Sequence, residues 1–242
     1  MTSRTAVVLV THNSGRFLSE TLESIHGQAR QADHLLAIDD HSTDGTFAAL
    51  QSSNFDVRLA TSASTDNTTR IAHNFLQGLR WAQSLSTDVV ILGDHDDIWH
   101  PTRIAHQVAR LELEPTAAML ASDGFLINEH GVALPGTLRD TFPVPSDFIS
   151  WRSRQQWNHV MGHSVATGGA SALRPAALPD WSIPPGWLHD RWWSLRALRE
   201  QALIVDPTVV IDYRLSGTQQ VGLDTGYQHS RREWLLSKAR HS

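Results

Sequence analysis

The most restrictive feature of the sequence is the alternation of short apolar runs with amphipathic stretches along residues 1–115. The run at residues 6–10 is uninterrupted and rich in valine, which is typical of a strand buried on both faces. Repeated β–α units fold into parallel sheets with right-handed crossovers. We therefore expect an α/β fold with a mainly parallel central sheet flanked by helices. The expected strands are 6–10, 34–38, 57–59 and 89–92, and the expected helices lie near 17–25, 46–51, 71–82 and 101–111.

The second half of the sequence is less regular than the first. We expect a strand at 117–121, a turn at 128–131, a proline-punctuated loop at 134–145, a helix at 190–201 and two strand-like runs at 203–205 and 208–213. No linker rich in glycine and serine separates two independent units. The simplest interpretation is one domain with two lobes.

Composition excludes several classes of protein. The net charge of −5 and a pI near 6.2 argue against a general nucleic-acid binder, which usually carries a basic surplus. The sequence has no cysteine, which excludes disulfides, thiolate metal sites and a cysteine nucleophile. No apolar run approaches the length of about 20 residues that spans a bilayer. The run at 7–10 is too short for the apolar core of a signal peptide, so we expect a cytoplasmic protein.

Two acidic clusters each follow a predicted buried strand: DDHSTDG at residues 39–45 and DHDD at residues 94–97. In open α/β sheets, ligands bind beyond the carboxyl ends of the strands, so we expect both clusters to face one crevice. Carboxylates without cysteine favour Mg²⁺ or Mn²⁺, and such a cation commonly binds a substrate phosphate. The alternative is that residues 39–45 form only a turn that caps the next helix.

Phosphate-binding loops of two common kinds are missing from the sequence. There is no G-x-x-x-x-G-K-[ST] motif and no G-x-G-x-x-G motif after the first predicted strand. Simple ATPase and dinucleotide-binding interpretations are therefore disfavoured.

The acidic clusters belong to a longer series of motifs that occurs in one known family. The series is VVLVTHN at 7–13, DDHSTDGT at 39–46, NF at 74–75, DHDDIW at 94–99, TGGA at 167–170, HDRWW at 189–193 and DYR at 212–214. In order and approximate spacing it resembles the family 2 glycosyltransferases of the GT-A fold, over roughly residues 5–222. The DxDDIW form is similar to a bacterial, rhamnosyltransferase-like branch of that family.

The resemblance implies an inverting transfer of a sugar from a nucleoside diphosphate to an acceptor hydroxyl, with Mn²⁺ or Mg²⁺ as cofactor. It implies that Asp40 accepts a hydrogen bond from the base and that Asp39 supports the nucleoside. Asp96 is then the more direct metal ligand, and Asp94 lies nearer the ribose. Asp190 takes the role of general base.

On the same basis, residues 1–242 form one GT-A domain, with a nucleotide-sugar-binding lobe at 1–115 and an acceptor lobe with a C-terminal helix at 116–242. The remaining candidate donor contacts are Thr11, Asn13, Gly168, Gly169 and Arg214. The candidate acceptor contacts are Trp187, His189 and Trp192, because aromatic faces suit sugar C–H surfaces. Each has a plainer alternative: packing for the tryptophans, a structural histidine, a tight turn for the glycines and a salt bridge for Arg214.

One departure from the family pattern concerns activity. Ser216 and Gln219 stand where the family usually has histidine and asparagine. This leaves open a non-catalytic protein that binds a nucleotide or a glycan. A sugar-nucleotide nucleotidyltransferase is a further alternative, although residues 11–16 make only a poor triphosphate-binding loop.

The expected partners follow from the resemblance and from the last residues. A carboxylate beside the base pairs with the N3–H of uracil or thymine, so UDP- or dTDP-sugars are the expected donors. The expected acceptor is a glycan, a lipid-linked molecule or a small molecule of cell-surface polysaccharide synthesis. The basic segment at 231–240 surrounds Trp234, Leu235 and Leu236. We expect a solvated terminus there, and the alternative is a short amphipathic helix that contacts the inner face of an anionic membrane.

Overall fold

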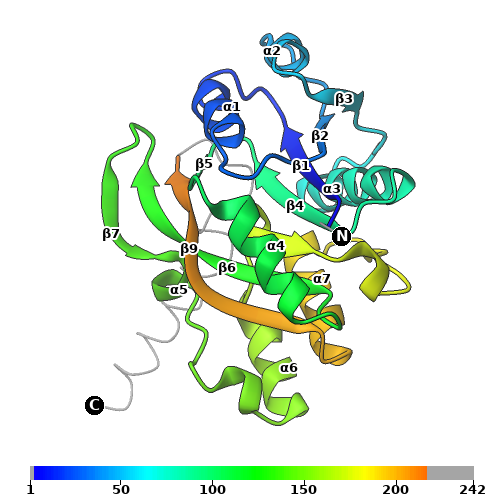
Figure 1. Ribbon diagram of the computed structural model, residues 1–242, viewed down its shortest axis with the longest axis vertical. Coiled ribbons are helices and arrows are strands. Elements are labelled where there is room, and N and C mark those ends of the chain that lie inside the picture. The colour runs from blue at the N-terminus through cyan, green and yellow to red at the C-terminus, as the bar shows by residue number, and fades with distance from the viewer. Residues whose placement is uncertain (1–2, 217–242) are drawn as a thin grey trace.

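The computed structural model describes residues 3–216, and the structural statements below concern that part of the chain (Figure 1). Its centre is one nine-stranded sheet with the order β3-β2-β1-β4-β8-β6-β9-β5, in which β7 pairs with β6. The strands are β1 (Thr5–Thr11), β2 (His34–Asp39), β3 (Asp56–Leu59), β4 (Val89–Asp94), β5 (Ile98–Trp99), β6 (Met119–Asn128), β7 (Ala133–Thr137), β8 (Ser171–Leu173) and β9 (Leu203–Leu215).

The first four strands confirm the parallel sheet that the sequence predicts. β1 lies between β2 and β4 and runs parallel to both, and β3 runs parallel to β2. The sheet becomes mixed beyond β4, because β8 runs antiparallel to both β4 and β6. β9 then runs parallel to β6, and the short β5 runs antiparallel to β9.

Helices cover both faces of the sheet. They are α1 (Leu18–His26), α2 (Thr46–Ser52), α3 (Asn67–Ser84), α4 (Arg103–Leu113), α5 (Leu138–Thr141), α6 (Ser153–Gly162) and α7 (His189–Arg199). Short 3₁₀ turns lie at Phe148–Ser150, Gly168–Ala170 and Pro175–Ala177. Within residues 3–216, no helix is both long enough and apolar enough to cross a membrane.

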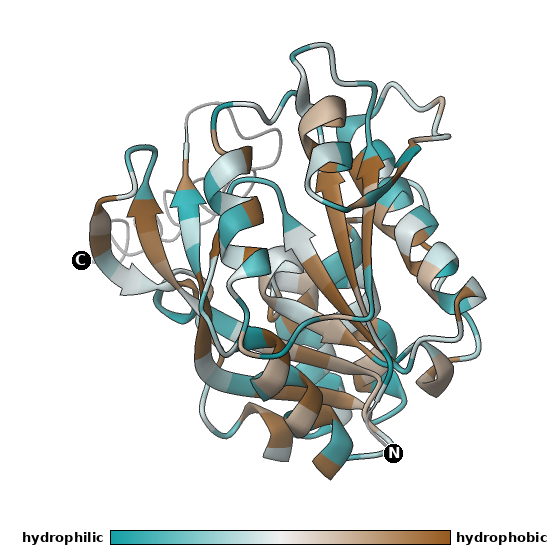
Figure 2. Ribbon diagram, turned by 45° about the horizontal axis from the view of Figure 1, so that its top comes forward, coloured by the Kyte–Doolittle hydropathy of each residue, from teal (hydrophilic) through white to brown (hydrophobic). Residues whose placement is uncertain are grey.

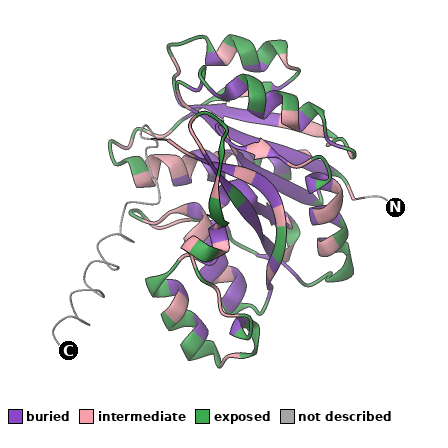
Figure 3. Cartoon of the chain, turned by 90° about the vertical axis from the view of Figure 1, so that its left-hand side faces the viewer, coloured by how far each residue is buried: buried purple, intermediate pink, exposed green. Residues whose placement is uncertain are grey.

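The side chains of β1 divide the hydrophobic core into two parts. Val7 and Leu9 belong to the cluster that includes the apolar faces of α1 and α4. Val8 and Val10 point the other way, into the cluster that includes α3 and α7. Both faces of β1 are therefore covered, which explains why the run at residues 6–10 is apolar at every position. Figures 2 and 3 show the hydrophobic, buried central strands and the helices that cover them, whose outer faces are polar and exposed.

The second half differs from the sequence predictions in three places. The predicted strand at 117–121 is longer, because β6 continues to Asn128. The runs at 203–205 and 208–213 form one strand, β9, since the chain stays extended through Pro207 while its register with β6 shifts. The predicted loop at 134–145 contains most of β7 and the short α5. A capping box between Thr137 and Asp140 stabilises the start of α5.

The contact between α3 and β1 gives the first prediction. A Cβ at Gly78 would overlap with Val8 Cγ1, so Gly78→Ala should lower the free energy of unfolding by about 1–3 kcal/mol through overpacking. Gly162→Ala is the matched control, because a Cβ there meets nothing within 4 Å at the end of α6. Urea unfolding monitored by circular dichroism measures both variants. Equal stability of the two variants would contradict this packing.

Candidate active site

A cavity of about 420 Å³ lies where β1, β2 and β4 end. It brings together residues from both acidic clusters, since Asp40, Asp94 and Asp96 all line it. Its other walls come from the end of β1, from α3, from the turn at Gly168, from the start of α7 and from the end of β9. The lining residues from those elements include Thr11, His12, Asn13, Ile71, Asn74, Phe75, Thr167, Gly168, Leu188, His189, Asp190, Tyr213 and Ser216.

Asp39 is buried beneath the cavity and holds two loops together. Its carboxylate accepts hydrogen bonds from Thr11 Oγ1 at 2.8 Å, from the Ser42 amide at 2.9 Å and from Ser42 Oγ at 2.6 Å. These three donors use both carboxylate oxygens, so Asp39 shapes the loop and does not itself line the cavity.

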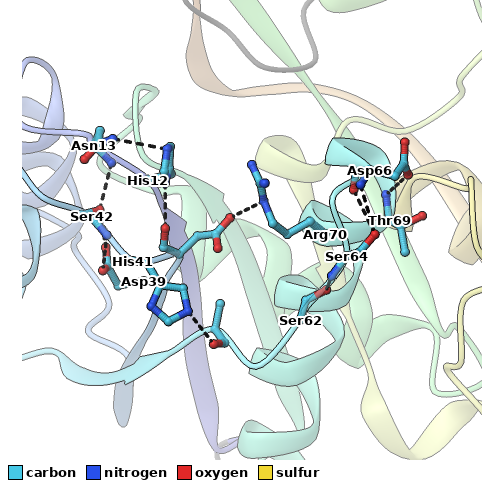
Figure 4. A network of polar contacts seen from close by, with 12 residues as sticks. His12, Asn13, Asp39, His41, Ser42, Ser62, Ser64, Asp66, Thr69 and Arg70 are labelled. Carbon is cyan, nitrogen blue, oxygen red and sulfur yellow. Dashed lines mark hydrogen bonds and ion pairs between the residues drawn. The ribbon is translucent and has the colours of Figure 1, made fainter.

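Asp40 lies at the wall of the cavity, and its charge is paired. Arg70 Nε lies 2.7 Å from Asp40 Oδ2, and this ion pair joins the loop after β2 to the first turn of α3 (Figure 4). No sequence motif points to Arg70. The available signal was a cation directly before the predicted helix at 71–82 and four residues before Asn74.

The loop after β1 is fixed by its own hydrogen bonds. Asn13 has a positive φ of 47°, and its side-chain oxygen accepts a bond from the Thr43 amide at 2.9 Å. The Asn13 amide donates to Ser42 Oγ at 2.9 Å, and His12 Nδ1 lies 2.7 Å from the Asp40 carbonyl oxygen (Figure 4). The loops after β1 and β2 therefore form one polar unit at this end of the cavity.

In the second acidic cluster Asp96 and Asp97 are buried and Asp94 is half-buried at the cavity wall, and the electrostatics of the cluster reflect this. Burial, together with the negative charges of Asp96 and Asp190, raises the pKa of Asp94 to about 7. Burial also raises the pKa of Asp97 well above its ordinary value, again with Asp96 and Asp94 adding to it. Like charges held in low dielectric disfavour ionisation, so this cluster attracts a cation.

Arg103 is the buried cation behind this cluster. Its Nη2 donates to the Leu92 carbonyl at 2.6 Å, and its guanidinium lies 3.7 Å from the centre of the Trp99 ring. Burial lowers the pKa of Arg103 to about 9, whereas the charges of Asp97 and Asp94 raise it. Pro101 predicts the start of a helix here, but no sequence motif points to Arg103.

Arg214 holds the acidic loop from the other side. It is almost fully buried, its Nε donates to the Asp96 carbonyl at 2.8 Å, and its Nη2 lies 2.6 Å from Glu20 Oε2. Its amide donates to Asp97 Oδ1 at 3.1 Å. Arg214, a candidate donor contact from the sequence, is not among the residues that line the cavity.

Two consecutive glycines let the acidic loop and α7 approach each other. A Cβ at Gly169 would overlap with Asp97 Oδ2 and would lie 2.8 Å from Asp94 Oδ2. The Gly168 amide donates to Asp190 Oδ2 at 3.1 Å. Any larger residue at position 169 would therefore displace carboxylates of the cluster.

Asp190 lies in the first turn of α7 and lines the cavity. Burial raises its pKa to about 6, although the Arg191 and Gly168 amides bond to its carboxylate and lower the pKa. An aspartate with this pKa is ionised at neutral pH and can accept a proton, as a general base requires.

The three candidate acceptor contacts divide between the cavity and the core. His189 lines the cavity, but Trp187 and Trp192 are not among the lining residues. Their rings lie 5.2 Å apart and pack against the core, and Trp192 Nε1 donates to the Ser182 carbonyl at 2.8 Å.

The donor set of the cavity fits a hard divalent cation. Mg²⁺ is usually held by one or two carboxylates together with water and substrate phosphates. Asp94 and Asp96 line the cavity together, and the raised pKa of Asp94 indicates negative charge that a cation would stabilise. Among residues 3–216, no group of three or more His, Cys, Asp or Glu side chains is arranged to hold a metal. Further ligands would then be water or substrate oxygens.

The mixed sheet, its flanking helices and the acidic motif at the end of β4 define the GT-A fold of glycosyltransferases. The chain belongs to glycosyl transferase family 2, whose sequence model matches residues 6–174. A comparison with curated proteins found no significant match.

Solved structures confirm the fold. S. aureus TarS 1–349 in complex with UDP-GlcNAc has a TM-score of 0.65 at 16% identity, over 92% of this chain and 61% of that one. The mannosyltransferase PcManGT from Pyrobaculum calidifontis, in complex with GDP-Man and Mn²⁺, has a TM-score of 0.60 at 18% identity, over 96% and 60%. Glucosyl-3-phosphoglycerate synthase from Mycobacterium tuberculosis, with Mn²⁺, UDP and its glucosyl product, has a TM-score of 0.58 at 17% identity, over 88% and 73%. The present chain spans about three fifths of the TarS and PcManGT chains.

The raised pKa of Asp94 gives a prediction about stability. Between pH 4 and pH 7 the folded protein keeps a proton on Asp94 that the unfolded chain releases, so the free energy of unfolding should fall as pH rises through this window. Asp94→Asn removes the titrating group and should flatten that fall. Urea unfolding at pH 5 and pH 7.5 in metal-free buffer measures it.

The control for charge alone is Asp56→Asn, which removes an exposed aspartate on β3. It should leave the pH dependence of stability as in the wild type. If Asp94→Asn kept the full pH dependence, the burial of this carboxylate would be contradicted.

Proposed function

We propose that this protein transfers a sugar from a nucleoside-diphosphate sugar to an acceptor hydroxyl, with inversion and with Mn²⁺ or Mg²⁺. One observation carries the proposal. The same cavity is lined by a paired carboxylate, Asp40, at the loop after β2, by Asp94 and Asp96 after β4, and by Asp190 on α7. Base recognition, diphosphate binding and proton removal need these three kinds of group in one place.

Asp40 is proposed to accept a hydrogen bond from the base. Arg70 lies beside Asp40, where its guanidinium could donate a hydrogen bond to the nucleotide. A carboxylate suits the N3–H of uracil or thymine, which favours UDP- or dTDP-sugars. Asp39 and Asn13 would support the nucleoside by holding the loops after β1 and β2 in place, and Thr11 lines the cavity beside them.

Asp96 and Asp94 are proposed to hold the divalent metal, which when bound stabilises the charge that grows on the diphosphate leaving group. Asp190 would take the proton of the acceptor hydroxyl as its oxygen attacks the anomeric carbon. One displacement from the opposite side inverts the anomeric centre, and no enzyme nucleophile is needed.

The finer assignments are proposals of the same kind. Residues 1–115 would bind the donor and residues 116–242 the acceptor. The acceptor would be a glycan, a lipid-linked molecule or a small molecule, and the DxDDIW motif suggests a rhamnosyltransferase-like enzyme of cell-surface polysaccharide synthesis. Residues 231–240 lie outside the described part, so their contact with a membrane, like the cytoplasmic location, stays a prediction.

A non-catalytic, nucleotide-binding protein is the second candidate. The observation that favours it is Ser216, which lines the cavity where the family usually has a histidine. It predicts ligand binding without release of free sugar or transfer to an acceptor.

Two substitutions separate the proposed roles. Asp190→Asn should keep the affinity for the nucleotide sugar within about twofold and lower the turnover by about 10²–10⁴-fold. Asp96→Asn should instead lose the part of nucleotide binding that depends on Mn²⁺.

Turnover of the wild type should rise with pH through about 6, because Asp190 must be ionised to act as a base. Calorimetry measures binding, and release of nucleoside diphosphate with water as acceptor measures turnover.

Asp180→Asn is the control, because Asp180 is an exposed residue that precedes α7 and does not line the cavity. It should change neither quantity. Full activity of Asp190→Asn, or equal loss of binding in both test variants, would show that these roles are wrong.

A further inference from the structure

Asn74 is a buried amide that has no hydrogen-bond partner in the part of the chain that the structure describes. It lies on α3, its side chain has no solvent exposure, and it lines the cavity. Neither Nδ2 nor Oδ1 bonds to any group in the described part of the protein. Buried polar atoms in folded proteins are almost always paired, so such a residue requires an explanation.

Another buried amide in the same protein shows the usual arrangement. Gln107 is also fully buried, and its Nε2 donates to Ser122 Oγ at 3.1 Å and to the Ala170 carbonyl at 2.9 Å. Its Oε1 accepts a bond from Arg103. A fully buried amide in this protein can thus be completely paired, whereas Asn74 has no hydrogen-bond partner within residues 3–216.

His189 has the same property on the neighbouring wall. Only 4% of it is exposed, and neither ring nitrogen has a hydrogen-bond partner within residues 3–216. Burial lowers its pKa to about 3, so the ring is neutral and offers one donor and one acceptor. The ring stacks on Phe75, with centroids 3.8 Å apart and 20° between the planes.

The two residues are close neighbours through Phe75, which follows Asn74 in the chain and carries the stacked ring of His189. A Cβ at Gly168 would overlap with His189 Nε2, so only glycine lets the backbone lie this close to that edge of the ring. Asn74 and His189 line the same cavity as Asp94 and Asp190, and the two residues carry four polar atoms that have no hydrogen-bond partner within residues 3–216.

We propose that Asn74 and His189 bind the hydroxyl groups of the donor sugar, and that this sugar is uncharged; the inference rests on the proposed function. A hydroxyl both donates and accepts, which matches an amide and a neutral imidazole, each of which does both. Asp190, which lines the same cavity and is not a proposed metal ligand, would repel an acidic sugar. A site built to pair hydroxyls also rejects analogues that lack them, because its buried groups then stay unpaired.

The test compares nucleoside diphosphates with their sugar derivatives. Wild type, Asn74→Leu and His189→Phe are titrated calorimetrically, in Mn²⁺, with UDP, dTDP and GDP and with UDP-glucose, dTDP-glucose and GDP-mannose. For whichever diphosphate binds, we expect both variants to keep its Kd within twofold and to weaken the Kd of its sugar derivative at least tenfold. The difference isolates the sugar.

Thermal melting of the ligand-free proteins adds a second measurement. If Asn74 had a purely structural role, its replacement would lower the melting midpoint. Replacing an unpaired buried amide by an apolar group of similar shape should leave the midpoint of Asn74→Leu unchanged or higher. Gln107→Leu is the matched control, and it should melt at a lower temperature because its partners lose their bonds.

Two outcomes would overturn the inference: an unchanged ratio of the two Kd values in Asn74→Leu, or a melting midpoint of Asn74→Leu as low as that of Gln107→Leu. Wild-type protein that bound none of the three diphosphates would instead refute the proposed function, and the inference with it. His189→Phe keeps the stacked aromatic ring, so it tests the sugar contact separately.

Discussion

The burial of the acidic cluster after β4 is the constraint on which the rest of the structure depends. Asp94 and Asp97 are held in low dielectric beside Asp96, which raises the pKa of both. The positive charge of Arg103 offsets part of this negative charge. Burial also destabilises the charged form of Arg103 and lowers its pKa to about 9. The remaining negative charge faces the cavity. Burying like-charged carboxylates lowers stability, and a bound cation would offset this cost. The cluster is therefore suited to a cation that in turn binds a diphosphate.

The topology of the sheet brings the other groups to this cluster. Parallel pairing of β1 with β2 and β4 places residues 39–40 and 94–96 at the same edge, although more than fifty residues separate them in the sequence. The mixed part of the sheet then places the Gly168 turn and the start of α7 against that edge. Gly169 makes the close approach to Asp94 and Asp97 sterically possible. The acid-rich half and the half with Asp190 thus form one cavity.

The sequence predicts those parts of this arrangement that depend on local patterns. The strands and helices of residues 1–115 were predictable from apolar periodicity, and the acidic motifs from their position after buried strands. The continuity of β9 was not, because Asp206 and Pro207 look like a turn. They lie at an irregularity between Val205 and Val209, and it is the pairing of these two flanking residues with β6 that makes the segment one strand. Arg70 was missed because its partner, Asp40, lies 30 residues away along the chain. Arg103 was missed because the sequence does not show that its side chain is buried behind the acidic cluster. The unpartnered state of Asn74 and His189 is likewise visible only in three dimensions.

A crystal structure of the full chain grown with Mn²⁺ and a tightly bound nucleotide sugar tests the central claim most directly. The account predicts an anomalous manganese peak beside Asp96 and Asp94 and in contact with the diphosphate. It also predicts the base next to Asp40 and the sugar between Asn74, His189 and Asp190. A nucleotide bound outside this cavity, or inside it with manganese absent from the acidic cluster, would contradict the account.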